Sequence, residues 1–117
     1  VEGLKGPFSC LNNARYGISW GAVGAAQSCF SSAKEYALSR IQFDHPIASF
    51  QLVQNKLAWM LREITKGQLL AYHLGKKKDD GTWTSEQISL AKMNNVDMAL
   101  ALALMARYIH GANGILD

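Results

Sequence analysis

The fold is decided by the stretch from Phe50 to Leu74, FQLVQNKLAWMLREITKGQLLAYHL. Its apolar residues recur at alternating spacings of three and four, at Phe50, Val53, Leu57, Met60, Ile64, Ala71 and Leu74. This spacing places them on one face of an α-helix, and such a face is buried against other helices. We therefore predict a long, half-buried helix over about residues 49–78. The run of lysines at residues 76–78 lies where the helix dipole favours cations and needs no other partner.

A second long helix is predicted before this stretch, over about residues 12–39, following a loop at residues 3–7. Its small residues recur at helical spacing: Gly17, Gly21, Gly24 and Ser28. Because small residues let two backbones approach closely, we expect a neighbouring helix to pack on this stripe.

A third helix is predicted after the turn at residues 79–82. Thr84 and Gln87 have the spacing of a capping box at its start, and Gly111 and Gly114 mark its end. Its apolar positions repeat the helical spacing: Ile88, Ala91, Met98, Leu102, Met105 and Ile109. No strand pattern appears, so we predict an all-α, up-down helical bundle.

The run from Met98 to Ala106 is apolar on all sides of the third helix. Three helices alone cannot cover such a surface, so we expect a four-helix bundle that lacks its last helix here, a subunit interface, or both. The run is about half the roughly 20 residues needed to cross a bilayer, which predicts a buried helix segment without membrane insertion. Asp97 lies in the same region and should pair or face a wet interface.

Composition favours one folded domain or a piece of one. The chain has 117 residues, with 49% apolar and 18% charged, which excludes disorder. Its net charge of +3 is not interleaved with aromatic residues, so no nucleic acid is expected as a partner. Cys10 and Cys29 have no Cys-x-x-Cys spacing and the three histidines are isolated, so neither a disulfide framework nor a metal site is predicted.

The connection between the first two helices carries a candidate binding site. It reads Arg40-Ile41-Gln42-Phe43-Asp44-His45-Pro46-Ile47 and is followed by Gln51. Arginine has a planar fork suited to phosphate oxygens, and phenylalanine has a flat face suited to a ring system. These groups point to a nucleotide-type cofactor. The alternative is a capped turn in which Arg40 bonds the last carbonyls of the first helix.

Motifs in a fixed order along almost the whole chain carry a family resemblance. They are Gly6-Pro7-Phe8, the segment from Cys10 to Ile18, Trp20-Gly21, Arg40-x-Gln-Phe43, the segment from Gln51 to Ala58, Glu63-Ile64-Thr65 and His110-Gly111-Ala112-Asn113-Gly114-Ile115. With these motifs the chain resembles the C-terminal helical domain of the acyl-CoA dehydrogenases, and most closely the glutaryl-CoA dehydrogenase branch. Residues 1–117 would form part of that domain, with its last helix missing.

The resemblance implies FAD as cofactor, bound mainly by a neighbouring subunit. The positions implied in its binding are Arg40, Gln42, Phe43, Gln51, Tyr108, Ile109, His110, Gly111 and Ala112. Glycine at residue 111 would let backbone N–H groups approach a pyrophosphate, whereas without the resemblance an ordinary helix C-cap is the favoured interpretation of Gly111 and Gly114. The chain departs from the family at Ala112 and Asp44, where glycine is common, and at Tyr108, where an amide or acid is common.

The resemblance also implies an acyl-CoA site at the start of the first helix. Its positions are Phe8, Leu11, Asn12, Asn13, Ala14 and Arg15. Asn12 would bond the pantetheine chain and Arg15 would support the catalytic glutamate. The alternative is that Asn12 is a helix N-cap and Arg15 a surface residue.

The chemistry implied by the family is removal of the α-proton by a glutamate, with hydride transfer from the β-carbon to the flavin. In some members the glutamate precedes the arginine matched by Arg15, where this chain has Ala14. In the glutaryl-CoA branch it lies in a Tyr-Glu-Gly-Thr motif, which does not occur up to Asp117. We therefore expect no catalytic residue and no turnover from these residues alone.

Further expectations follow from the resemblance. They are a homo-oligomer, most simply a tetramer, an electron-transfer flavoprotein as electron acceptor, and a cytoplasmic or mitochondrial-matrix location. A dehydrogenase of another short acyl-CoA and a non-catalytic helical assembly module remain alternatives.

Overall fold

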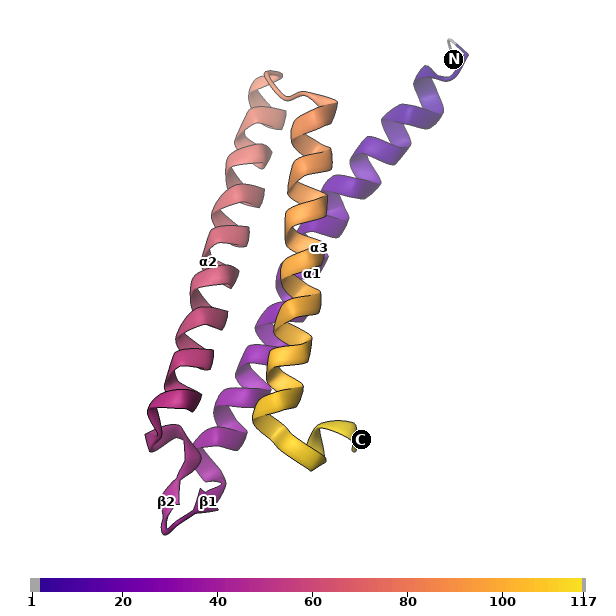
Figure 1. Cartoon of the computed structure of the whole chain (residues 1–117). Coiled ribbons are helices and arrows are strands. Elements are labelled where there is room, and N and C mark those ends of the chain that lie inside the picture. Colours follow the sequence, from indigo (N-terminus) through magenta and orange to yellow (C-terminus); the bar gives the residue numbers. More distant parts are fainter. Residues whose placement is uncertain (1–2, 117) are drawn as a thin grey trace.

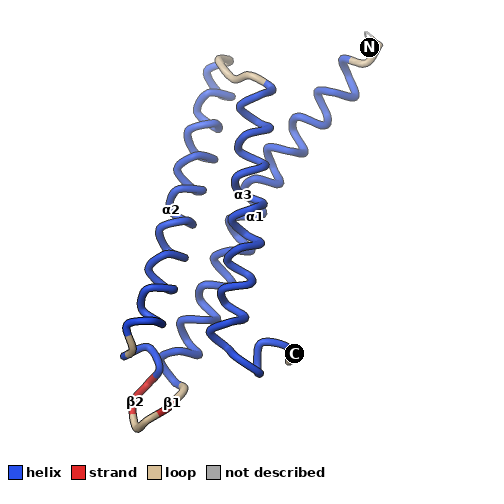
Figure 2. The backbone as a smooth tube through the Cα atoms, in the orientation of Figure 1, coloured by secondary structure: helices blue, strands red, loops and turns tan. Residues whose placement is uncertain are grey.

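The computed structural model describes residues 3–116, which form three long helices (Figure 1). They are α1 (Lys5–Ser39), α2 (Gln51–Asp80) and α3 (Ser85–His110). Between α1 and α2 lie the short strands β1 (Ile41–Gln42) and β2 (His45–Pro46) and the 3-10 turn η1 (Ile47–Ser49). A second 3-10 turn, η2 (Gly111–Ile115), follows α3. The predicted all-α class is confirmed, and Figure 2 shows how little of the chain lies outside helices.

The three helices form an elongated bundle that measures 66 × 26 × 15 Å. The helices α2 and α3 run side by side in opposite directions, while α1 packs mainly against α3 and diverges from both toward its N-terminus (Figure 1). The β1–β2 hairpin lies at the opposite end of α1, near the turn from α3 into η2.

Two sequence predictions about local structure are wrong. α1 begins at Lys5 rather than near residue 12. Pro7 does not prevent this early start, because it falls in the first turn, where backbone N–H groups have no acceptor within the helix. The absence of strands is also wrong among the described residues, since Ile41 pairs with Pro46 and Gln42 with His45. Each of these strands is two residues long, too short for a recognisable alternation.

The boundaries of α2 and α3 follow their predicted signals closely. Gly81 ends α2 in the left-handed conformation, with φ of 72°, and donates its N–H to the carbonyls of Lys77 and Lys78. The capping box of α3 is confirmed, since the Gln87 N–H donates to Thr84 Oγ1 at 3.3 Å and the Thr84 N–H donates to Gln87 Oε1 at 2.9 Å.

The core follows the predicted apolar faces of α2 and α3. Its largest buried side chains include Met60 and Ile64 of α2 and Leu102 of α3. The helix α1 contributes mainly small residues to the core, Val23, Ala26, Ala33 and Ala37. These short side chains allow the close packing of α1 on α3.

A buried asparagine, which the sequence patterns did not reveal, connects all three helices. Asn95 of α3 is fully buried, and its Nδ2 donates to the backbone oxygen of Ser19 on α1 at 3.1 Å and to that of Gly67 on α2 at 3.2 Å. Asn94 donates to Asn95 Oδ1 at 3.0 Å. A Cβ on Gly67 would lie 2.9 Å from Asn95 Oδ1, so glycine makes room for this amide.

The small-residue stripe on α1 is not used as predicted. Gly17, Gly21, Gly24 and Ser28 are all exposed, and a Cβ built on any of these three glycines meets no described atom within 4 Å. The helices α2 and α3 pack instead on the face of α1 that carries Ser19, Val23 and Ala26.

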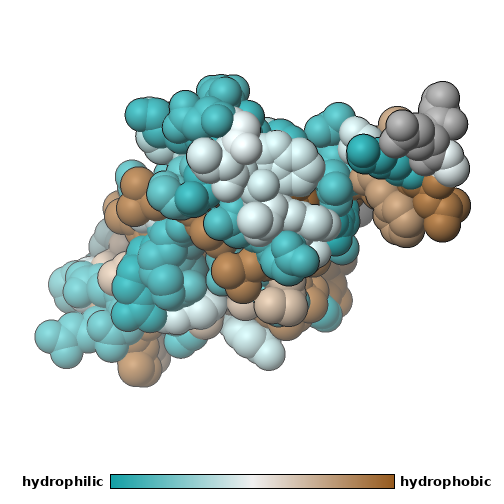
Figure 3. All heavy atoms as spheres, turned by 90° about the horizontal axis from the view of Figure 1, so that it is seen from above, coloured by the Kyte–Doolittle hydropathy of each residue, from teal (hydrophilic) through white to brown (hydrophobic). Residues whose placement is uncertain are grey.

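Apolar surface remains uncovered on α3 and at the start of α1. Figure 3 shows apolar surface, in brown, between the hydrophilic regions and at the projecting N-terminal end of α1. The exposed residues of α3 include Leu90, Met93, Val96, Leu100, Leu104 and Tyr108. Within the run from Met98 to Ala106, Leu100 and Leu104 are exposed, as expected if three helices alone cannot cover it, and the helix or subunit that covers them stays a prediction.

By length and composition, residues 85–115 meet the criterion for a membrane-spanning helix, which core helices of soluble proteins meet as well. One face of α3 lies in the core of the bundle. Asp97, on the exposed side of α3, faces solvent, in line with its predicted wet surroundings.

Replacing Asn95 by alanine should lower the free energy of unfolding by about 2–3 kcal/mol, since it removes two buried hydrogen bonds and leaves a cavity. Urea denaturation followed by helical circular dichroism measures this change. The matched control is Asn55→Ala on the exposed face of α2, which should change the free energy by less than about 0.5 kcal/mol. Equal effects of the two substitutions would contradict the role of Asn95.

Candidate functional site

The first candidate site lies where α1 approaches the start of α3. A cavity of about 490 Å³ is lined by Phe8, Leu11, Asn12, Arg15 and Ser85, and we call it the Arg15 cavity. Four of these five residues were predicted from the sequence as an acyl-CoA site. Ser85 was not, because it joins the site only through the packing of α3 on α1.

Arg15 is held in the Arg15 cavity entirely by neutral groups. Its Nη1 donates to Ser89 Oγ at 2.5 Å, and its Nη2 donates to Asn12 Oδ1 at 2.5 Å and to Ser85 Oγ at 3.1 Å. Its Nε is buried without a hydrogen-bond partner, and no carboxylate of the described residues pairs with it. A fixed guanidinium with an unused donor is suited to hold an anion.

The alternatives for Asn12 and Arg15 are both wrong. Asn12 lies in the second turn of α1 and is not an N-cap, since the helix begins at Lys5. Arg15 is partly buried and bridges α1 to α3, so it is not a free surface residue.

Asn13 and Ala14, also predicted for this site, are exposed and do not line the Arg15 cavity. The side chain of Asn13 instead accepts a hydrogen bond from Lys78 Nζ at 3.3 Å. The same ammonium lies 5.3 Å from the ring centroid of Tyr16 and 4.5 Å from that of Trp83. Lys78 therefore has partners beyond the helix dipole, contrary to the prediction for the lysine run.

The second candidate site lies at the other end of α1, where the end of α3 meets the β1–β2 hairpin. A cavity of about 390 Å³ is lined by residues of both segments, and we call it the Arg40 cavity. Its lining residues are Tyr36, Arg40, Gln42, Ile47, Ile109, His110, Gly111, Ala112 and Asn113. The structure thus brings together two predicted segments that are far apart in the sequence.

Arg40 presents an exposed guanidinium at this cavity. Its backbone N–H closes α1 by donating to the Tyr36 carbonyl at 2.8 Å. Its Nη1 donates to the Ile41 carbonyl at 3.0 Å, and its Nη2 donates to Gln42 Oε1 at 3.4 Å. The side chain therefore does not cap the last carbonyls of α1, and no described carboxylate pairs with it.

Phe43 and Asp44 form the tip of the hairpin in the left-handed conformation, with φ of 55° and 67°. This backbone is unfavourable for a bulky residue such as Phe43. The Phe43 ring is 78% exposed and makes an edge contact with Phe50, with ring centroids 6.4 Å apart. An exposed aromatic ring on strained backbone is a candidate contact for a ligand.

Three predicted cofactor residues lie outside the lining of the Arg40 cavity: Phe43, Gln51 and Tyr108. Gln51 is exposed at the first turn of α2, and Tyr108 is 69% exposed on α3.

The backbone at the end of α3 turns sharply. Gly111 ends α3 with φ of 61°, a conformation that glycine adopts without strain. A Cβ on Gly114 would lie 2.7 Å from the Arg107 carbonyl oxygen, so η2 folds back closely on α3. Both positions therefore favour glycine, Gly111 as the cap of α3 and Gly114 for its close approach to Arg107, and the backbone of residues 111–113 lies on the wall of the Arg40 cavity.

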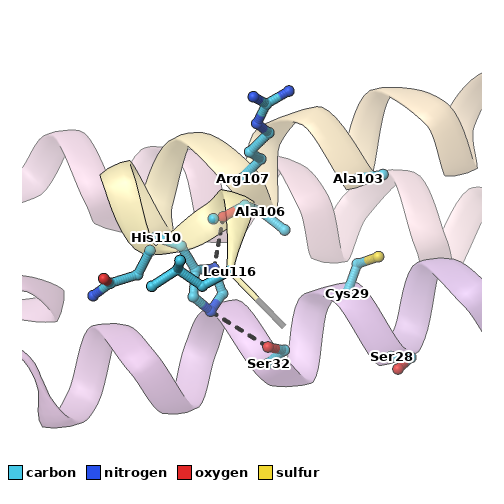
Figure 4. A pocket seen from close by; sticks show the side chains of 10 residues that line it. Ser28, Cys29, Ser32, Ala103, Ala106, Arg107, His110 and Leu116 are labelled. Carbon is cyan, nitrogen blue, oxygen red and sulfur yellow. Dashed lines mark hydrogen bonds between the residues drawn. The ribbon is translucent and has the colours of Figure 1, made fainter.

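His110 separates the Arg40 cavity from a third cavity of about 340 Å³ between α1 and α3 (Figure 4). Figure 4 shows the His110 ring directed from α3 toward Ser32 on α1, with Cys29 further along the same cavity. No pattern in the sequence indicated this cavity. Within residues 3–116 no group of acidic, histidine and cysteine side chains is arranged to hold a metal, and both cysteines are free.

Serine and tyrosine residues complete both predicted sites but were missed from the sequence. Ser85 and Ser89 are one helical turn apart on α3, and Tyr36 lies one turn before Arg40. The spacing of one helical turn between Tyr36 and Arg40 was an available signal. Only the packing of the helices shows which turn of one helix meets which turn of another.

Similar sequences and similar solved structures cover almost the whole chain. The sequence model of the family described as "Acyl-CoA dehydrogenase, C-terminal domain" matches residues 2–117. A solved structure of glutaryl-CoA dehydrogenase from Mycobacterium smegmatis, in complex with FADH2, is 50% identical with a TM-score of 0.95, and the match covers 98% of this chain and 30% of that one.

More distant members match over the same region. Butyryl-CoA dehydrogenase from Megasphaera elsdenii is 31% identical with a TM-score of 0.93, covering 97% of this chain and 30% of its own. The 3-(aryl)acrylate reductase of Clostridium sporogenes is 36% identical over 97% of this chain and 30% of its own length. The chain therefore spans less than a third of the length of these relatives.

Proposed function

Because this chain belongs to the acyl-CoA dehydrogenase family, we propose that it is the C-terminal helical domain of a larger FAD-dependent acyl-CoA dehydrogenase. The observation that carries the proposal is the Arg40 cavity, where Arg40 and the Gly111 turn meet across about 70 residues of sequence. Two separate segments that a cofactor of this class would contact thus face one space.

The residues of the Arg40 cavity fit a dinucleotide. The guanidinium of Arg40 has no acidic partner among the described residues and can hold phosphate oxygens with its fork. The backbone at Gly111 and Ala112 can approach a pyrophosphate, and the exposed ring of Phe43 offers a flat face to an aromatic system. When bound, FAD supplies the redox chemistry, because its flavin is the acceptor of the hydride from the β-carbon of the acyl thioester.

We assign the Arg15 cavity to the acyl-CoA substrate. Phe8 and Leu11 give it an apolar wall, and the Asn12 amide can bond the amide groups of pantetheine. Arg15 would hold the carboxylate of the general base, because its buried Nε awaits an acceptor. No glutamate lines this cavity among the described residues and residue 14 is alanine, so we place that base elsewhere in the protein.

The separation of the two cavities supports an oligomer. Arg15 lies on α1 and Arg40 is the C-cap of the same helix, 25 residues later, which corresponds to about 37 Å at the α-helical rise. Hydride transfer requires the reacting atoms to be about 3 Å apart. We infer that the Arg15 cavity and the Arg40 cavity of one chain serve different active sites, with FAD shared across a subunit interface of a homotetramer.

We propose glutaryl-CoA as the substrate, with dehydrogenation and decarboxylation to crotonyl-CoA. The 50% identity to the Mycobacterium smegmatis glutaryl-CoA dehydrogenase favours it over the butyryl-CoA dehydrogenase at 31%. The reductase of aryl acrylates shows that the same domain also occurs in enzymes with other substrates. An electron-transfer flavoprotein as acceptor, and a cytoplasmic or mitochondrial-matrix location, complete the proposal.

The substrate is tested with the visible spectrum of the full-length protein under anaerobic conditions. Addition of glutaryl-CoA should bleach the bound flavin, and butyryl-CoA should bleach it less at equal concentration. Bleaching by butyryl-CoA alone would move the substrate to another short acyl-CoA. A protein without flavin would instead favour the non-catalytic assembly module.

Replacing Arg40 by alanine in the full-length protein should weaken FAD binding about tenfold or more, because a charge-assisted contact to phosphate is lost. Flavin content per subunit after purification measures the change. Arg62→Ala removes an exposed arginine on α2 and serves as the matched control, with full flavin content expected. Unchanged flavin in Arg40→Ala would remove Arg40 from the cofactor site.

Replacing Arg15 by alanine should lower kcat by about tenfold to a hundredfold while flavin stays bound, since the position of the general base is then no longer fixed. Arg15→Lys should recover only part of the loss, because lysine keeps the charge without the fork that bonds Ser89 and Asn12. Loss of flavin rather than of turnover would show that Arg15 belongs to a different site.

A further inference from the structure

We propose that Tyr36 and Asn113 are positioning residues of the Arg40 cavity, whose hydrogen bond fixes η2 against α1 and so preassembles the cofactor site. This inference rests on the proposed binding of FAD. Neither residue was among the site residues predicted from the sequence. Both line the Arg40 cavity, Tyr36 from α1 and Asn113 from η2.

Tyr36 connects the two segments of the cavity. Its backbone carbonyl accepts the N–H of Arg40 at 2.8 Å, so it belongs to the turn of α1 that places the guanidinium. Its hydroxyl accepts a hydrogen bond from Asn113 Nδ2 at 3.1 Å. One residue therefore bonds both the Arg40 segment and the segment that follows Gly111.

The turn into η2 has few other attachments to α1. Gly111 reverses the chain with positive φ, and the N–H of Leu116 bonds the Asn113 carbonyl within η2 itself. Gly114 packs on Arg107 of α3, which holds η2 to its own helix. Among the described residues, the Asn113–Tyr36 bond is the one hydrogen bond from η2 to α1.

The ring of Tyr36 is itself held in place by His110. The two rings are stacked, with centroids 4.6 Å apart and planes inclined by 30°. His110 Nδ1 bonds the Ala106 carbonyl at 2.8 Å, so Nδ1 carries a proton, and Nε2 lies 3.4 Å from Ser32 Oγ (Figure 4). These contacts hold the imidazole plane, against which the Tyr36 ring is stacked.

A site held in its binding geometry before the ligand arrives binds more tightly, because less ordering is left to occur on binding. Loss of the Asn113–Tyr36 bond should leave the Gly111–Asn113 backbone free to shift at the cavity wall. The affinity for FAD should then fall, although neither Tyr36 nor Asn113 is one of the predicted cofactor contacts.

The test is a double-mutant cycle in the full-length protein, with Tyr36→Phe, Asn113→Leu and both together. Titration of FAD into the apoprotein, followed by quenching of flavin fluorescence, gives each Kd. Each single variant should bind FAD about fivefold more weakly, as expected for the loss of one neutral hydrogen bond. The double variant should bind FAD with about the same Kd as each single variant, because both substitutions remove the same interaction.

Tyr72→Phe is the matched control, since it removes an exposed tyrosine hydroxyl on α2 and should leave the Kd unchanged. The thermal midpoint of each apoprotein should stay within about 2 °C of the wild type, which separates positioning from general destabilisation. Unchanged affinity in Tyr36→Phe, or a double variant about 25-fold weaker, would overturn the proposal. Absence of FAD binding by the wild-type protein would instead overturn the proposed function.

Discussion

The amide of Asn95 fixes the register of the whole bundle. It bonds a backbone oxygen on α1 and another on α2 from a buried position on α3, so all three helices share one reference point. A buried asparagine among apolar residues favours the single alignment in which its hydrogen bonds are made. Sliding α3 by one turn, about 5.4 Å, would break these bonds.

Both cavities depend on this alignment because each is formed by α1 together with one end of α3. Toward the start of α3, the register places Ser85 and Ser89 beside Arg15. At its end, the same register places Gly111 and Asn113 beside Tyr36 and Arg40. A shift of α3 that improved one contact would displace the other. The polar core residue therefore links two sites that lie at opposite ends of the molecule.

The helices could be predicted because periodic apolar residues and capping signals are local properties. The faces of α2 and α3 and the capping box at Thr84 follow directly from spacing. The role of Asn95 was not predicted, because a polar residue at a core position interrupts the apolar pattern. Only its hydrogen-bond partners on two other helices explain it. The prediction that a helix packs on the small residues from Gly17 to Ser28 failed among the described residues for a related reason. Spacing shows which residues share a face of a helix but not what covers that face.

The candidate sites could be predicted in part. Arg40 was predicted from the chemistry of its own stretch of chain, and the family resemblance implied Arg15 and the Gly111 segment as well. That Arg40 and the Gly111 segment share one cavity depends on the parallel course of α3 along α1, which α2 makes possible by leading the chain back, a property of tertiary structure. Ser89 bonds Arg15 on another helix, and Tyr36 bonds Asn113 from another element. No pattern within a single stretch of sequence could therefore assign these two residues to the sites.

The first turns of α1 diverge from the bundle while carrying Phe8 and Leu11, two walls of the Arg15 cavity (Figure 1). Helical turns without tertiary support open at low free-energy cost, because local stability follows local burial. Whatever packs on these turns thus controls how often the cavity is complete. Each opening of these turns removes part of the cavity wall, so the apparent affinity for any ligand falls with the fraction of molecules in which the cavity is incomplete, even with every cavity residue intact.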